Sequence, residues 1–215
     1  MKAIILWIMI CAHTSSLFAQ KTQVFSLSPL ARETKKVNGL VVGIGHFDKK
    51  VETKEINGVN VDLMALSPFV VFMAAMYGSN LKQTHTDTTI NVNGINLALG
   101  GYLTSVNHKG VNVAMYNAGH SMKGISFNAT FNAVHEMKGL SIAGFGNYTD
   151  YATGLNIAPI NFDKQMRGVQ IGIYNKSLHV KGLQIGLINI SDDVRGLQLG
   201  VFNKNRKRVL PFINF

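Results

Sequence analysis

Cysteine is nearly absent from this chain of 215 residues: the only one, Cys11, lies in the apolar segment at the N-terminus. We interpret residues 1–19 as a secretory signal peptide, since Lys2 gives a positive start and Ala19 is a small residue before the expected cleavage. If Cys11 leaves with this segment, disulfides, thiol catalysis and cysteine-ligated metal are excluded. We expect an exported protein of the cell envelope, the outer membrane or the cell surface.

Acidic residues are also few, which leaves the chain strongly basic. Eleven Asp and Glu stand against 21 Lys and Arg, a formal net charge of +10; without Lys2, twenty basic residues against eleven acids leave +9. This excess favours anionic partners such as envelope components, acidic glycans, lipopolysaccharide or phospholipid headgroups. Alternatively, the charge only keeps a β-rich surface in solution. Export makes nucleic acid a poor candidate partner, whereas membrane association and the oligomeric state stay open.

The sequence patterns of common enzymes are missing. No G-x-S-x-G elbow, phosphate-binding loop or H-E-x-x-H motif occurs, and the acidic residues form no pair of the kind that glycosidases need. His120 and His135 each stand three residues after an asparagine, but two histidines without a third ligand make a weak metal site. We therefore predict that the protein is not an enzyme and has no catalytic residues, metal or cofactor.

What the chain has in abundance is a repeat centred on glycine. Each unit reads glycine, apolar, Gln/Asn/Ser, apolar, small residue, as in Gly182-Leu-Gln-Ile-Gly186, and the period is always 14 or 15 residues. A fixed short period indicates a repeat-built architecture. Looser copies surround Gly39 and Gly58, and Gly94 restarts the run. The regular glycines are Gly110, Gly124, Gly139, Gly154, Gly168, Gly182 and Gly196, and the asparagines that end the units are Asn117, Asn132, Asn147, Asn161, Asn175, Asn189 and Asn203.

Alternation within a unit has a period of two, with Leu183 and Ile185 on one face and Gln184 on the other, which is typical of strands. The units fit two all-β folds. In a β-solenoid, each unit is one rung stacked about 4.8 Å from the next, and the asparagines form a ladder of amides at a corner. In an antiparallel outer-membrane β-barrel of about 12 strands, those asparagines would face lipid without a partner. We favour the solenoid, because both sets of turns also have equal length.

The domain organisation is simple. After the signal peptide we expect a polar lead-in over residues 20–36 and a single repeat-built β domain over 37–215. Within it, Ser67, Pro68 and Gly78 are typical of a helix start and stop, which predicts a short helical insertion at about 67–78. Such a helix would cap one end of the solenoid, whose open edge could otherwise pair with another molecule.

A basic residue precedes six of the seven regular glycines. Stacked rungs would align these residues about 5 Å apart, where like charges repel, and an anionic polymer would relieve that repulsion and release counterions. Alternatively, they are edge residues that discourage strand pairing, partly neutralised by Glu136, Asp163, Asp192 and Asp193. The candidate polyanion-binding residues are Lys109, Lys123, Lys138, Arg167, Lys181 and Arg195.

The repeat text resembles the surface-repeat proteins of leptospires and Bacteroidota, whose units read G-L-Q-I-G-L-x-N. The match covers Gly94 to Phe215, and the ending from Lys207 onward is similar to the family's usual close. The resemblance implies a surface or envelope location and no catalytic residue. We predict an exported, non-enzymatic structural or adhesive module that binds anionic polymers through its basic stripe; the alternative is a small outer-membrane barrel acting as a pore or anchor.

Overall fold

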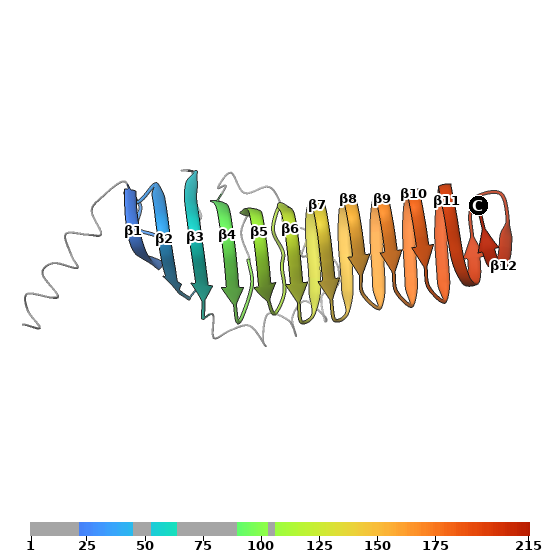
Figure 1. The fold of residues 1–215 in the computed structure, drawn as a ribbon, viewed down its shortest axis with the longest axis horizontal. Helices are drawn as coiled ribbons and strands as arrows, with labels where there is room; N and C mark the ends of the chain where they lie inside the picture. The colour runs from blue at the N-terminus through green and yellow to red at the C-terminus, as the bar shows by residue number, and fades with distance from the viewer. Residues whose placement is uncertain (1–21, 45–52, 64–89, 103–105) are drawn as a thin grey trace, which may run out of the picture.

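The computed structural model describes residues 22–44, 53–63, 90–102 and 106–215, which form twelve strands stacked in sequence order (Figure 1). The expected signal peptide (1–19) and helical insertion (67–78) both lie outside these residues. The strands are β1 (Thr22–Ser28), β2 (Lys36–Gly43), β3 (Lys54–Asp62), β4 (Ile90–Ala98), β5 (Val106–Ala114), β6 (Ser121–Asn128), β7 (Phe131–Ala143), β8 (Gly146–Ile157), β9 (Ile160–Ile171), β10 (Tyr174–Ile185), β11 (Ile188–Lys204) and β12 (Val209–Asn214).

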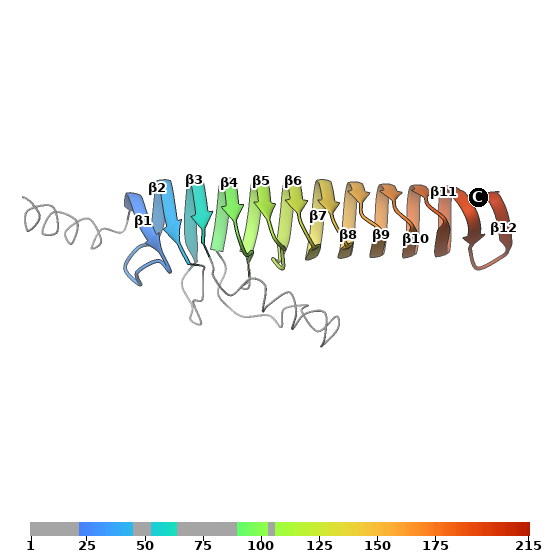
Figure 2. The same cartoon turned by 90° about the horizontal axis from the view of Figure 1, so that it is seen from below.

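Consecutive strands from β1 to β11 pair in parallel, and the repeats stay in register from one rung to the next. Between β10 and β11, for example, Lys181 pairs with Arg195 and Gly182 pairs with Gly196. The result is one elongated stack, seen from two sides in Figures 1 and 2. The predicted β-solenoid is thus confirmed, and the antiparallel alternative is wrong for the described residues, because only their last strand, β12, runs antiparallel to its neighbour.

The repeat glycine is required where neighbouring rungs approach most closely. Gly182 has φ 141°, which side chains rarely adopt, and a Cβ built there would lie 2.0 Å from the carbonyl oxygen of Gly168 on the preceding rung. Any other residue would therefore have to push two rungs apart. This explains why glycine recurs at one position while the neighbouring positions vary.

The interior of the solenoid is largely polar. Asn161 donates to Asn175, Asn175 to Asn189 and Asn189 to Asn203, each over 2.8 Å, so the predicted asparagine ladder is confirmed. A second buried ladder runs two residues after the glycines, where Gln198 donates to Gln184 over 2.8 Å and Gln184 to Gln170 over 2.7 Å. Because these amides bond to the next rung, most of the polar groups that the stack buries are paired. Asn117, the first residue of the asparagine ladder, keeps a buried Oδ1 atom without a partner among the described residues.

Apolar residues fill the interior only in part. The position two residues before the glycine is buried and mostly apolar, as in Met122, Met137, Met166 and Val180. On the glycine side of the rung, the amide column points inward, so the aliphatic residues one and three after the glycine point outward. Alternation therefore separates the two faces as expected, with the polar face inside.

The sheet begins earlier than the expected domain boundary at residue 37. Strand β1 lies within the expected polar lead-in and pairs in parallel with β2. Just after β1, the ammonium group of Lys54 donates to the carbonyl oxygens of Leu30 and Ala31 over 2.9 and 3.2 Å. This segment lacks a repeat glycine, so the repeat pattern in the sequence does not predict strand β1.

At the C-terminal end, β12 turns back along β11. The amide of Asn214 donates to Gln198 over 2.8 Å and so continues the interior ladder by one more residue. The guanidinium of Arg208 lies 4.0 Å from the ring centroid of Phe215, which ties the last residue to the turn. This antiparallel strand pairs with the C-terminal part of β11, from Gln198 to Lys204.

Candidate polyanion-binding column

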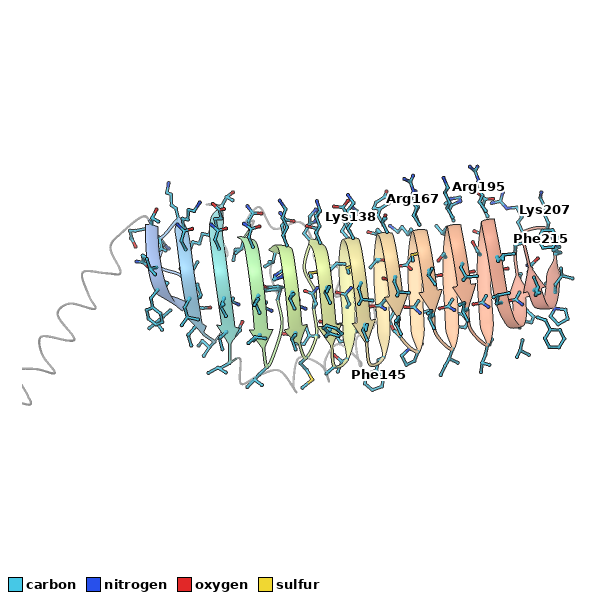
Figure 3. The ribbon with its side chains drawn as sticks, in the orientation of Figure 1. Lys138, Phe145, Arg167, Arg195, Lys207 and Phe215 are labelled. Carbon is cyan, nitrogen blue, oxygen red and sulfur yellow. The ribbon has the colours of Figure 1, made fainter. Side chains whose placement is uncertain are left out.

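The register of the strands brings all six predicted basic residues into one column along a long edge of the solenoid. Lys109 pairs with Lys123, which pairs with Lys138; further along, Arg167 pairs with Lys181, and Lys181 with Arg195. Thr153 stands between the two groups. Figure 3 shows Lys138, Arg167 and Arg195 projecting from the same edge. We call Lys109, Lys123, Lys138, Arg167, Lys181 and Arg195 the basic column.

On the three rungs N-terminal to Lys109, amides take the place of the cations at the same register position. These residues are Asn93, Asn57 and Asn38. Asn93 donates to Asn57 and Asn57 to Asn38, each over 2.8 Å, so these outward side chains form a third ladder. Sequence reasoning missed this continuation, although an asparagine stands directly before Gly39, Gly58 and Gly94. Positive charge along the column is therefore confined to β5–β11.

Two carboxylates sit beside the basic column and neutralise part of it. Glu136 lies 3.5 Å from the ammonium of Lys123 and 2.5 Å from that of Lys138, and hydrogen bonding to Lys138 lowers the pKa of Glu136. Asp193 lies 3.7 Å from the guanidinium of Arg195, whose side chain is 79% exposed. The sequence-based expectation of partial neutralisation is met at these two positions.

The remaining cations are open. Within the described part of the chain, Lys109, Arg167 and Lys181 form no ion pair, and all three are accessible at the surface. Asp192, which was expected to neutralise the column, makes no ion pair with any described residue either. About half of the column's charge is thus available to an external anion.

Asp163 does not neutralise the column, so that expectation is wrong. The chain bends after residue 163, which places this side chain inside the solenoid, 5% exposed. There it accepts hydrogen bonds from Thr149, Asn156 and Gln170. Burial raises its pKa to about 7, although the bonds from Gln170 and Asn156 oppose the shift. A strict alternation of inward and outward side chains, continued through the bend, would place Asp163 on the outside of the solenoid.

The two histidines expected on adjacent rungs do lie together. The ring centroids of His120 and His135 are 5.3 Å apart, and the Nδ1 atom of His135 lies 2.8 Å from a carboxylate oxygen of Asp150. The ammonium of Lys164 lies 3.0 Å from the other oxygen of that carboxylate. In the part of the chain that is described, no group of three or more candidate metal ligands occurs.

Comparison with protein-family models, curated proteins and solved structures finds no match for this chain. The resemblance to surface-repeat proteins therefore stays a prediction from the repeat text. Among the described residues there is also no helix long and apolar enough to cross a membrane.

Proposed function

We propose that the protein is an exported structural or adhesive module of the cell envelope, which binds anionic polymers along the basic column. The observation that carries this proposal is the in-register stacking of six cations on one edge of the solenoid. Signal-peptide features and the resemblance of the repeats support an envelope, outer-membrane or surface location.

The close spacing of the cations in the basic column provides the driving force for binding an anionic polymer. Two unit charges on neighbouring rungs, about 5 Å apart, repel by about 1 kcal/mol even in water. An acidic glycan or lipopolysaccharide with regularly spaced anions would replace this repulsion by attraction and release counterions. Lys109, Arg167 and Lys181 carry most of the expected affinity, because no described carboxylate competes for them.

The rigid backbone of the stack also favours binding of a polymer. The glycine position and the interior ladders fix every rung relative to the next, so the Cα atoms of the basic column are already in place before binding. Only the side chains lose freedom, which reduces the entropic cost of association.

The test is retention of the protein on an immobilised acidic polysaccharide, with a variant matched in charge. Changing Lys109, Arg167 and Lys181 to Gln should shift elution to clearly lower salt. The control changes Arg32, Lys176 and Lys204 to Gln, which removes three exposed charges outside the basic column. The control should elute close to wild type; if both variants shift equally, net charge alone explains retention and the column has no special role.

The alternative function as a pore or anchor depended on antiparallel strands. Strands β1 to β11 are parallel, so the described residues do not provide that arrangement. We therefore retain the binding module as the single proposed function.

A further inference from the structure

The outside of the solenoid carries a continuous apolar surface beside the basic column. One and three residues after each repeat glycine, aliphatic side chains such as Leu183 and Ile185 stand outward in register with the next rungs. We call these two columns, repeated from β2 to β11, the apolar face. Several members are 38–44% exposed, and Leu97 and Leu197 reach 44%. An exposed apolar surface of this length marks an interaction site rather than scattered surface residues.

The turns that follow the apolar face are apolar as well. Leu99, Phe145, Ile173 and Leu187 lie in turns and Val201 lies at the matching position within β11; all five are 55–67% exposed. We call these five residues the apolar edge. Figure 3 shows Phe145 on the long edge opposite to the one that carries Lys138, Arg167 and Arg195. The molecule is therefore amphipathic across its short dimension, with cations along one edge and apolar side chains along the other.

We infer that the apolar edge and apolar face seat in one leaflet of an anionic phospholipid membrane, with the basic column at the level of the lipid phosphates. This inference goes beyond polymer binding, because a polysaccharide needs only the basic column and leaves the apolar residues in water. Burying apolar surface supplies affinity, and each cation near an anionic surface adds roughly 1 kcal/mol.

The dimensions of the rung match those of a leaflet. From Lys181 in the basic column to Leu187 in the apolar edge is six residues, or about 20 Å at about 3.3 Å per residue. The hydrocarbon of one leaflet is about 15 Å thick, and its headgroup layer adds about 5–7 Å. When Leu187 approaches the middle of the bilayer, Lys181 therefore stands among the phosphates.

The interior also tolerates such an environment. Hydrocarbon requires that backbone and amide groups find partners within the protein. Here the strands bond along the stack, and buried amides such as Gln184 and Asn189 bond to neighbouring rungs. The side chains that would meet lipid on the apolar face are aliphatic or aromatic. On the opposite wall, the exposed Lys176 stands three residues from Ile173, so its ammonium would have to extend along the wall toward the headgroups.

Charge favours a lipid surface over a second copy of this chain. The apolar face is bordered along β5–β11 by the basic column, so its partner needs anions beside apolar groups. Only Glu136 and Asp193 pair with these cations among the described residues, and both are already engaged. An anionic phospholipid offers both chemistries in one surface, whereas the described residues of another copy offer no column of acids.

A first experiment measures binding of the mature chain (residues 20–215, without the expected apolar signal peptide) to vesicles of phosphatidylcholine with and without phosphatidylglycerol, by flotation. Changing Phe145, Ile173 and Leu187 together to Ser should weaken binding to the anionic vesicles at least tenfold. The control for position is Leu178→Ser, a single change that removes a 44% exposed leucine from the bend near the basic edge and should leave binding unchanged. Circular dichroism verifies that the variants keep the β fold.

A second experiment reads depth directly and needs only single substitutions at exposed sites. Residues 20–215 contain no tryptophan, so a single reporter is placed by Leu187→Trp or by Leu178→Trp. Lipids brominated on their acyl chains should quench the tryptophan at 187 strongly and the one at 178 little. Equal quenching at both sites, or none at either, would overturn the inference.

The proposal of polymer binding and the inference of lipid binding can each be contradicted without the other. Retention on acidic polysaccharide without vesicle binding, or vesicle binding that the serine triple variant leaves intact, overturns the lipid inference and leaves the polymer proposal standing. Vesicle binding that needs the apolar edge, in a protein that acidic polysaccharide does not retain, supports the lipid inference and overturns the polymer proposal.

Discussion

Single glycines control how closely the rungs approach. At Gly182 both the backbone angle and the carbonyl oxygen of Gly168 exclude a side chain. We predict that Gly182→Ala lowers the free energy of unfolding by about 2–5 kcal/mol, the sum of backbone strain and overpacking. Urea unfolding followed by circular dichroism measures this loss.

Gly119 provides the control. It lacks a positive φ, and the nearest atom to its added Cβ, the carbonyl oxygen of Val106, is 3.0 Å away. Gly119→Ala should cost clearly less than Gly182→Ala. Similar losses in both variants would mean that the close approach of the rungs at Gly182 does not govern stability.

A buried carboxylate makes stability depend on pH. The pKa of Asp163 is raised from 3.8 to about 7 in the folded chain, mainly because burial disfavours the charged form. Between these values the folded state binds more protons than the unfolded state, so this group's contribution to stability falls as the pH rises from about 4 to 7. At pH 8 the fold must hold an ionised carboxylate in its interior.

We predict that Asp163→Asn stabilises the protein more at pH 8 than at pH 5, relative to wild type. Asparagine has nearly the same shape and carries no charge, so the variant lacks the loss that wild type suffers on ionisation. Other titrating groups, including the buried His108, contribute equally to both proteins and cancel in the difference. Urea unfolding of both proteins at the two pH values gives the comparison; an equal difference at both would show that Asp163 has an ordinary pKa.

Among the elements, β12 has a protective role. It is the described strand that runs antiparallel, and it covers the C-terminal part of the β11 edge, from Gln198 to Lys204, which would otherwise offer unpaired backbone groups. We predict that removal of residues 205–215 makes the protein associate through β11. Sedimentation velocity should show larger species for the truncated chain than for the full chain.

The variant Asn214→Ala is the control for the truncation, because it removes a side-chain hydrogen bond and leaves strand β12 in place. The variant loses the hydrogen bond to Gln198 but keeps β12, so it should associate no more than wild type. If the truncated chain also sediments like wild type, the edge of β11 does not need this cover.

The elements differ in how well the sequence predicts them. The constant spacing of glycine and asparagine fixes which residues share a column, so the asparagine ladder and the basic column are predictable. Strand β1 is not, because Thr22–Ser28 has no repeat glycine and gains its place by pairing with β2. Asp163 is assigned wrongly because alternation is interrupted at a bend, where no proline or glycine marks the change.

At the scale of the whole molecule, the main surprise is which face is buried. Alternation shows that Gln184 and Leu183 point in opposite directions, but gives no inward direction. Burial normally favours the leucine. In a stack of identical rungs, amides satisfy one another along the axis, so the polar face closes inside and the aliphatic face is left outside. The same reversal creates the apolar face and the amphipathic cross-section.

The central claim is that the stack turns six scattered basic residues into one binding column. Its most direct test is the dependence of the affinity for an acidic polysaccharide on salt concentration, measured by titration calorimetry. Because the slope counts the cations that displace counterions, changing Lys109, Arg167 and Lys181 to Gln should reduce it by at least half, since carboxylates partly neutralise the other three cations. The variant with Arg32, Lys176 and Lys204 changed to Gln should keep the wild-type slope. Equal slopes for the two variants would contradict a binding column.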